Sequence, residues 1–291
     1  MNNPQIIIFG EVLFDCFPDG NLVLGGAPFN VAWHLQAFGV SPLFISRIGN
    51  DAYGKIIKKA MEDWGMNITG LQEDKINPTG MVQVKLINNE PHYDILENSA
   101  YDFIDSSLIP NLPQHSILYH GTLALRNSTS AKTLEKIKTD ISPSIFIDVN
   151  LRSPWWNLNR IKLLLKQASS LKLNQEELSF IVKEEKNINQ AINHLFSTYP
   201  FNNIILTKGK AGAILFTRDN ITHQISPSQN TTVIDTVGAG DAFCSVLILG
   251  MVKKWDILTT LIKAQKFASA IVGIQGATTN LKSFYASFLK H

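Results

Sequence analysis

The chain contains little cysteine and no long apolar run. Only Cys16 and Cys244 occur, far apart and without the spacing of metal ligands. Such usage is typical of a reducing cytoplasm, and we expect both thiols to be inert apolar residues. No apolar run approaches the ~20 residues that cross a bilayer. The short run at 6–10 has no basic flank, which predicts a strand and not a signal peptide. We therefore expect a cytoplasmic protein without a membrane partner.

An excess of either charge is also missing. The chain has 26 basic and 24 acidic residues, for a net charge of +2, and the basic residues are scattered. Because a nucleic-acid binder gathers its basic residues into one stripe, we expect no nucleic-acid partner. Apolar residues are abundant, at 45% of 291. This content is enough to bury the core of one large domain spanning 1–291.

Short apolar runs alternate with helical patterns along most of the chain. Buried strands are predicted at 6–10, 42–48, 116–121, 144–149 and 203–208. Helices are predicted at 52–64, 131–141 and 257–274, the first capped by Asp51 and stopped by Gly65. Strands that alternate with helices indicate a mainly parallel sheet covered on both faces.

Two segments break this alternation, and each reads as a β-hairpin. Residues 12–17 and 21–25 flank Pro18-Asp19-Gly20, and residues 80–87 and 92–96 flank a second turn. Neither hairpin is followed by a crossover helix. We expect the regions of about 11–25 and 79–97 to form a small separate sheet that covers a substrate. The alternative is a pair of edge hairpins on the main sheet.

The stretch 235–243 carries the strongest chemical signal. Glycines at 238 and 240 leave consecutive backbone N–H groups accessible, and an apolar helix that begins near Ala239 would aim its positive end at the same point. Asp241 adds a carboxylate beside this anion site. Phosphoryl transfer needs this combination. The alternative is a tight turn in which Asp241 only caps the helix.

Polar groups near the start of the chain suit a polyol. Gly25 and Gly26 permit close approach of a ligand, Asn30 can both donate and accept hydrogen bonds, and Asp15 can accept two hydroxyl groups. A glycine turn beside a solvated aspartate is the other interpretation. At the end of a predicted strand, Arg152 in Asp148-Val149-Asn150-Leu151-Arg152 suits an anionic group or an ion pair between elements.

Two further strand ends suit a nucleotide and its metal. Asn174 and Glu177 lie three residues apart on one side of a starting helix and could hold the hydration shell of Mg²⁺, although an acidic helix start looks the same. Downstream, a glycine-rich strand end could meet a nucleotide or form a solvated hairpin. Its candidate contacts are Thr207, Lys208, Gly209 and Gly212.

Two glycine patterns point elsewhere and are rejected. Residues 49–56 fit a P-loop except that Ile56 replaces the hydroxyl that binds Mg²⁺. The Gly-Ala-Gly turn has Phe243 at the third glycine position of a dinucleotide-binding fingerprint, and no N-terminal strand introduces it. A Rossmann dehydrogenase is therefore a weak alternative.

Together these motifs resemble the ribokinase-like carbohydrate kinases, the pfkB family, over almost the whole chain. The segments that carry the resemblance are Gly25-Gly26 with Asn30, Arg47-Ile48-Gly49 with Asp51 and Gly54, Asn174 with Glu177, Thr207 with Gly209 and Gly212, and 235–243. Gly-Gly-Ala-Pro-x-Asn-Val-Ala is similar to the fructokinase branch. The resemblance implies a three-layer α/β/α ribokinase-like fold with a mainly parallel sheet and a small β-sheet lid.

The resemblance also implies an activity, namely phosphorylation of a free sugar by ATP with Mg²⁺. Fructose is the expected sugar, 2-keto-3-deoxygluconate or another sugar is the alternative, and a non-catalytic sugar-binding relative is a distant third. A homodimer that pairs the two lids is expected from the family.

Roles carry over position by position. Asp241 would be the general base, and the amides of Gly238, Ala239 and Gly240 would hold charge on the phosphoryl oxygens. Asp15, Gly26 and Asn30 would bind sugar hydroxyls, with Arg152 as a further sugar or phosphate contact. Asn174 would lie by the phosphates, Glu177 would reach Mg²⁺ through water, and Thr207, Lys208, Gly209 and Gly212 would line the nucleotide. Asp235 matches a position at a monovalent cation site, for K⁺.

Overall fold

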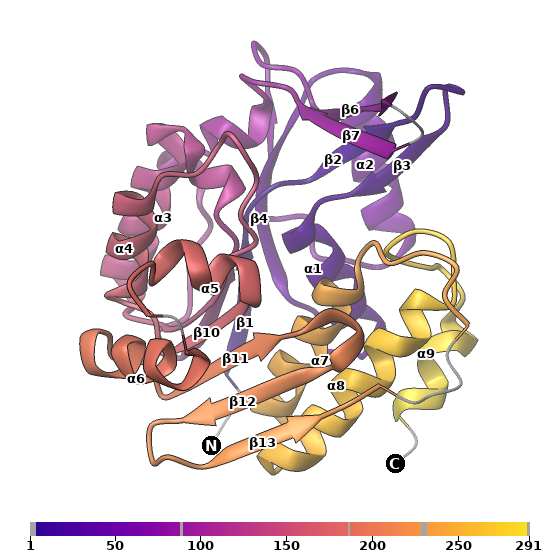
Figure 1. Cartoon of the computed structure of the whole chain (residues 1–291). Coiled ribbons are helices and arrows are strands. Elements are labelled where there is room, and N and C mark those ends of the chain that lie inside the picture. The colour runs from indigo at the N-terminus through magenta and orange to yellow at the C-terminus, as the bar shows by residue number, and fades with distance from the viewer. Residues whose placement is uncertain (1–3, 88–89, 186, 228–231, 290–291) are drawn as a thin grey trace.

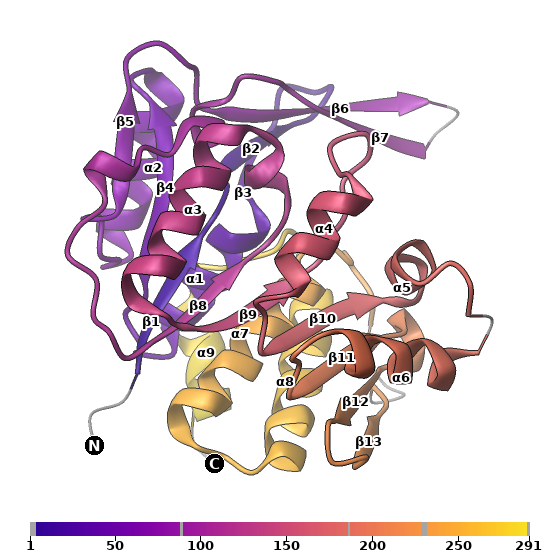
Figure 2. The ribbon, with the colours of Figure 1, turned by 90° about the vertical axis from the view of Figure 1, so that its left-hand side faces the viewer.

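The large sheet of the protein is mainly parallel and lies between two helical layers (Figures 1 and 2). The computed structural model describes residues 4–87, 90–185, 187–227 and 232–289. The sheet has nine strands in the order β13-β12-β11-β10-β9-β8-β1-β4-β5, and β12 and β13 pair antiparallel. The bounds are β1 (Gln5–Phe9), β4 (Leu43–Gly49), β5 (Leu71–Asp74), β8 (Ser116–His120), β9 (Ser144–Asp148), β10 (Ser170–Asn174), β11 (Asn203–Thr207), β12 (Ala213–Thr217) and β13 (Thr222–Ile225).

Alternate residues of the buried strands feed two separate cores, one on each face. Ile6 and Ile8 of β1 pack into the first core and Ile7 and Phe9 into the second, because successive side chains point to opposite faces. The first core takes α1 (Ala27–Ala37), α2 (Ala52–Asp63), α7 (Ala239–Lys253), α8 (Ile257–Val272) and α9 (Lys282–Leu289). The second takes α3 (Ser128–Ile141), α4 (Leu158–Leu165), α5 (Gln175–Ile181) and α6 (Ile188–Thr198). The predicted three-layer arrangement is confirmed.

The order of the strands reverses at β1, and this fixes where a ligand site can form. The chain passes from β1 to β4 through α1 on one face, whereas β8 leads to β9 through α3 on the other. Ligands of open parallel sheets gather at the carboxyl ends of the strands at such a switch point. Here these ends lead into Gly10-Glu11, Gly121-Thr122 and Val149-Asn150.

The two predicted hairpins form a second, four-stranded sheet in the order β3-β2-β6-β7. Its strands are β2 (Leu13–Cys16), β3 (Leu22–Gly25), β6 (Gly80–Ile87) and β7 (Glu90–Ile95), and β2 pairs β6 in parallel. The turn at 88–89 lies outside the described residues. Because this small sheet is separate from the main one (Figure 1), the edge-hairpin interpretation is wrong.

Asp51 ties the start of the small sheet to the main body. It caps α2 as predicted by accepting from the Gly54 amide at 2.8 Å. Its two carboxylate oxygens also accept from the Thr79 amide and hydroxyl, each at 2.8 Å. Thr79 immediately precedes β6, so one side chain fixes both a helix start and the entry into the small sheet. The same contacts give 49–56 a structural role in place of a P-loop.

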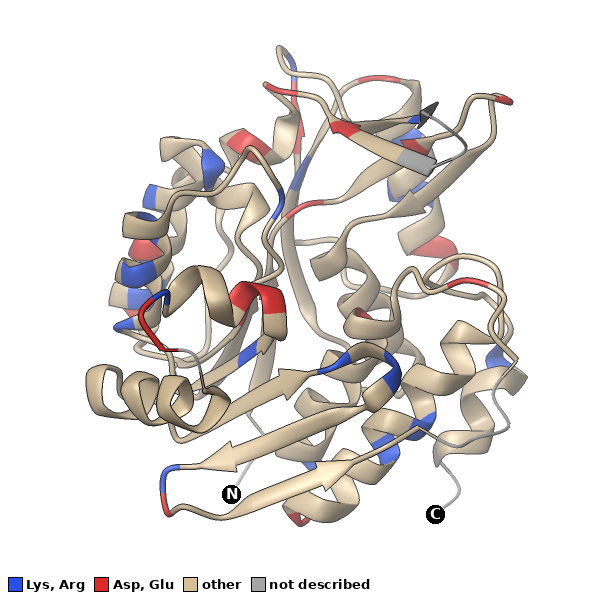
Figure 3. Ribbon diagram, in the orientation of Figure 1, with Lys and Arg blue, Asp and Glu red and all other residues tan. Residues whose placement is uncertain are grey.

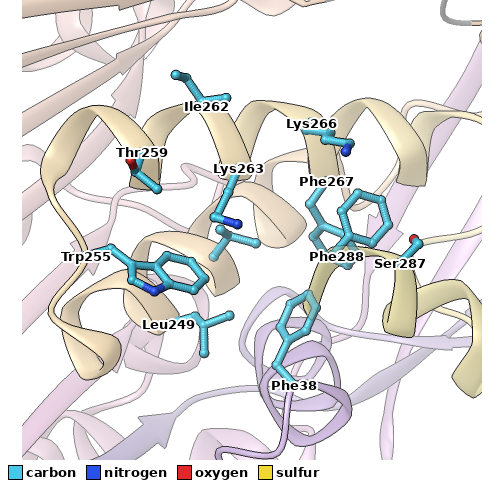
Figure 4. Close-up of a pocket in the computed structure, with 11 residues that line it drawn as sticks. Phe38, Leu249, Trp255, Thr259, Ile262, Lys263, Lys266, Phe267, Ser287 and Phe288 are labelled. Carbon is cyan, nitrogen blue, oxygen red and sulfur yellow. The ribbon is translucent and has the colours of Figure 1, made fainter. Parts of the chain in front are cut away.

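An apolar cavity lies away from all the candidate residues. It has a volume of about 210 Å³, and its lining comes mainly from α7, α8 and α9 and includes Phe38, Phe267 and Phe288 together with Lys263 and Lys266 (Figure 4). Elsewhere, basic and acidic positions are interspersed along the outer helices (Figure 3). Within the described part of the chain, every helix is too short or too polar to span a membrane.

Candidate active site

The glycine turn before α7 has the shape of an anion site. Gly238 is the residue before the helix and has φ 77°, a left-handed conformation that favours glycine. A Cβ at this position would lie 2.3 Å from Cβ of Ala277, so the turn packs directly on the segment after α8. The first amides of a helix have no intrahelical partner. Ala239 donates to Thr236 O only at 3.5 Å, so its amide is only weakly engaged within the turn.

We expect Gly238→Ala to destabilise the protein far more than Gly39→Ala. The two glycines have nearly equal φ angles, 77° and 76°, but a Cβ added to Gly39 would have nothing within 4 Å. Both variants pay the left-handed strain of about 1–2 kcal/mol, and only Gly238→Ala also collides with Ala277. Thermal unfolding of the two variants measures the difference. Equal losses would show that the turn can move away from Ala277.

Asp241 lies in the first turn of α7, where its carboxylate faces α1. Its Oδ2 accepts a hydrogen bond of 2.8 Å from Nδ2 of Asn30. Gly238 occupies the cap position, so the interpretation of Asp241 as a mere helix cap is wrong. Burial raises the pKa of Asp241 to about 6, and the Asn30 hydrogen bond opposes this rise. A carboxylate with this pKa is ionised at neutral pH and can accept a proton.

The predicted sugar residues gather beside Asp241. A Cβ on Gly25 would lie 3.8 Å from Oδ2 of Asp15 and 3.9 Å from Oδ1 of Asn30, so the missing side chain leaves space between two acceptors. Oδ1 of Asn30 is buried and has no partner among the described residues. Gly26, at φ 112°, packs on the carbonyl of Glu11, where a Cβ would come within 2.7 Å. The cluster offers acceptors for several hydroxyl groups.

Arg152 is exposed and carries the positive charge that acts on this cluster. Burial raises the pKa of Asp15 to about 6, and the Arg152 charge opposes the rise. The same guanidinium lowers the pKa of Asp241. The charge of Arg152 therefore acts on both Asp15 and Asp241, and its role as a sugar or phosphate contact stays a prediction.

Glu11 is a buried carboxyl group beside the candidate residues that the sequence interpretation missed. It follows β1, is buried to 3% exposure, and its Oε2 has no hydrogen-bond partner in the described structure. Burial raises its pKa to about 7, Arg152 opposes this, and Asp241 adds to it. The only signal in the sequence was an acidic residue directly after an apolar strand.

The sequence interpretation also missed Lys172, whose ammonium lies close to Gly240 of the anion turn. Its Nζ donates to both carboxylate oxygens of Asp148, at 2.9 and 3.0 Å. Cys244 Sγ donates to the same carboxylate at 3.4 Å, and Tyr119 Oη lies at 3.5 Å. Burial raises the pKa of Cys244 well above its ordinary value, so this thiol is neutral. A lone lysine inside the apolar strand β10 was the available signal.

Asn174 and Glu177 form a reciprocal capping box at the start of α5. Asn174 Oδ1 accepts from the Glu177 amide at 2.8 Å, and Glu177 Oε2 accepts from the Asn174 amide at 2.7 Å. Glu177 Oε1 accepts from the Leu151 amide at 2.9 Å. Both oxygens thus already have one donor each and retain a second lone pair for a water. Asn174 is paired with Thr207 across the sheet.

The remaining predicted residues form two turns near these strand ends. Lys208 donates its amide to Gly212 O at 2.7 Å, and Gly209 has φ 54°. Gly212 packs on β13, where a Cβ would lie 1.9 Å from Ile225 O. Asp235 accepts from the Val237 and Gly276 amides, each at 3.0 Å, and so joins the anion turn to the segment after α8. The roles of these residues stay predictions.

The match of a family model settles the class of protein. The model of the pfkB family carbohydrate kinases matches residues 16–283. The chain belongs to this family. It is therefore a carbohydrate kinase, a phosphotransferase with an alcohol group as acceptor.

Individual members of the pfkB family are similar over nearly the whole chain. A fructokinase of Klebsiella pneumoniae is 28% identical over 86% of this chain and 85% of its own length. A fructokinase of Escherichia coli is 28% identical over 95% and 96%. The solved fructokinase of Xylella fastidiosa with bound ATP has a TM-score of 0.88 at 19% identity, with 98% of both chains covered.

A double-mutant fructokinase of Vibrio cholerae, solved with fructose, ADP and potassium ion, has a TM-score of 0.84 at 23% identity over 100% of both chains. At these identities the solved structures show the pfkB fold.

Proposed function

We propose that this pfkB-family kinase is an ATP-dependent fructokinase. The observation that carries the proposal is the hydrogen bond from Asn30 to Asp241. It supports the proposal because it joins Asn30, which we propose binds sugar hydroxyls together with Asp15 and Gly26, to the candidate base. The fructokinase relatives at 28% identity support the choice of sugar. The hydrogen-bond acceptors of Asp15 and Asn30 support it as well, because they suit the hydroxyl groups of an uncharged sugar.

Asp241 takes the proton from the attacking sugar hydroxyl. Asn30 orients the carboxylate through Oδ2, and the pKa of about 6 keeps it ionised at neutral pH. The amides of Gly238, Ala239 and Gly240 receive the charge that builds on the phosphoryl oxygens, where each well-placed donor is worth about 2.7–4 kcal/mol. Arg152 binds the sugar or the transferred phosphoryl group from the side of Asp15.

A nucleotide phosphate would bind at the anion turn, because Gly238 precedes the start of α7 and the first amides of a helix have no intrahelical partner and attract anions. Thr207, Lys208, Gly209 and Gly212 line the nucleotide, and Asn174 lies by its phosphates. Among the described residues no cluster of three acidic, histidine or cysteine groups could enclose a metal. Mg²⁺ keeps several waters and needs few direct protein ligands, so Glu177 would hold it through a water. When bound, it would supply neutralisation of charge on the phosphate oxygens.

Two further elements modulate the site in this proposal. Asp15 is carried by β2 of the small sheet, so sugar binding favours closure of that sheet, and closure keeps water from the reacting groups.

Asp235 lies at the site of a monovalent cation such as K⁺. The Vibrio cholerae structure with potassium ion supports testing this effector first.

A sugar panel tests the substrate. We expect ATP-dependent turnover with fructose to exceed that with glucose, ribose, a riboside or 2-keto-3-deoxygluconate by at least about tenfold in kcat/KM, because a site built to bind hydroxyls rejects analogues that leave its polar groups unpaired. The assay couples ADP release to NADH oxidation, with and without each sugar. Preference for the sugar acid would transfer the assignment to a 2-keto-3-deoxygluconate kinase, with Arg152 binding its carboxylate.

A further inference from the structure

The proposed mechanism leaves a buried ion pair beside the anion turn without a role. Lys172 of β10 and Asp148 of β9 face each other across the parallel ladder. Their side chains are 10% and 1% exposed, and Nζ bonds both carboxylate oxygens. A buried pair of this kind is weak evidence for stability, because apolar residues of similar volume are often as stabilising. The pair therefore calls for a role other than holding the sheet together.

The pair is oriented, with its positive end toward the turn. A Cβ on Gly240 would lie 3.2 Å from Nζ of Lys172, and no atom of Asp148 lies within 4 Å of that point. The carboxylate of Asp148 accepts from Sγ of Cys244, which lies one turn further along α7, and from Oη of Tyr119. Gly240 is thus the place where a side chain would separate the ammonium from the turn. Glycine keeps the ammonium close.

We propose that Lys172 is a positioning residue for phosphoryl transfer, whose ammonium, held by Asp148 behind Gly240, stabilises negative charge that arrives at the anion turn. This inference rests on the proposed role of the turn and Asp241. The ammonium needs no contact with the phosphoryl oxygens, because a charge acts over several ångströms in an interior of low dielectric constant.

The charges that face Asp241 determine how a pH measurement will respond. Burial raises the pKa of Asp241, Asp148 raises it further, and Lys172 and Arg152 lower it. Removing the charge of Asp148 must therefore shift the pKa of Asp241 downward. The other titratable groups coupled to Asp241 are Glu11, Tyr119 and Cys244, and none of them is altered in the variants below.

Two variants test the inference. The double variant Lys172→Met with Asp148→Asn removes both charges and leaves no unpaired ion. We expect it to lower kcat about tenfold or more at pH 8, where Asp241 is ionised, while the dissociation constant for fructose stays the same. Asp148→Asn alone should move the acidic limb of the kcat/KM profile to lower pH. A merely structural role would change stability without moving that limb.

The matched control is Lys138→Met, because Lys138 is another buried lysine, on α3, whose Nζ pairs with Glu135 at 3.0 Å. It should leave kcat and the pH profile unchanged. A kcat of the double variant within about twofold of wild type, or an unmoved limb in Asp148→Asn, overturns the inference. If neither variant folds, the pair belongs to the core alone and the inference is also overturned.

Asp241→Asn, measured in parallel, separates this inference from the proposed function. If Asp241→Asn abolishes turnover and the pair variants behave as wild type, only the role of Lys172 fails. If Asp241→Asn remains active, the proposed base itself is wrong.

Discussion

Replacing Asp241 by asparagine is expected to lower kcat by about 10²–10⁴-fold, the contribution of a general base. Asparagine keeps the size of the side chain and its contact with Asn30, but it cannot accept the proton of the sugar hydroxyl. Steady-state kinetics with fructose and ATP measure kcat, and calorimetry measures fructose binding, which should persist. Asp256→Asn is the control, since Asp256 caps the neighbouring helix α8 and should be catalytically silent. Equal kcat values for wild type and Asp241→Asn would remove the residue from the mechanism.

The same variant should be at least as stable as the wild type at neutral pH. The folded-state pKa of Asp241 is raised from 3.8 to about 6, so the folded protein holds this proton more tightly than the unfolded chain. Its contribution to stability is therefore present below pH 4 and is lost as the pH rises through 6. Thermal unfolding at pH 5 and pH 8 tests this. A large loss of stability at pH 8 would point to a structural role.

The raised pKa also sets the pH dependence of the reaction. Activity needs the ionised carboxylate, so kcat/KM should fall as the pH falls through about 6. The pKa values of Asp15 and Glu11 are raised into the same range. The acidic limb of the kcat/KM profile therefore reports the three coupled carboxyl groups together and not Asp241 alone.

The second large effect is expected at Asp15. Asp15→Ala should lower kcat/KM for fructose by about 10²–10⁴-fold, because two hydrogen bonds to a charged acceptor, each worth about 1.5–3 kcal/mol, are lost. The KM for ATP should stay unchanged, since Asp15 lies on β2 with the sugar cluster. Titration with each ligand separates the two effects.

Asp19→Ala is the matched control, because Asp19 is an exposed aspartate in the turn of the same hairpin, and among the described residues its side chain accepts only from the Asn21 amide. It should leave fructose binding unchanged. An equal loss in the two variants would assign the effect to the hairpin as a whole, and no loss at Asp15 would place the sugar elsewhere.

The periodic parts of the chain were predictable because burial dictates their patterns. Strands buried on both faces, such as β1 and β8, read as continuous apolar runs. Helices such as α2 show their cap and their apolar stripe. The turn residues predicted the two hairpins, but only the structure shows that β2 and β6 pair to make a separate sheet.

Contacts between segments that are distant in the sequence were not predictable in the same way. Asn30 and Asp241 are 211 residues apart, and nothing in either segment predicts that they share a hydrogen bond. The pairing of Lys172 with Asp148 depends on the register of β9 and β10, which a single sequence does not specify. Glu177 could be foreseen at a helix start, but not that it would also accept from Leu151. The cytoplasmic location and the lid-paired dimer stay predictions.

The central claim is that Asp241 and the glycine turn join a bound sugar to a transferred phosphoryl group. A rapid-quench single turnover tests it most directly, with excess enzyme, fructose and ATP labelled in the γ-phosphoryl group. It isolates the chemical step from product release. We predict that wild type converts the label to a fructose phosphate within its first turnover, and that Asp241→Asn, with fructose bound, does so at least about 100-fold more slowly. Transfer at the same rate in both proteins would contradict the account.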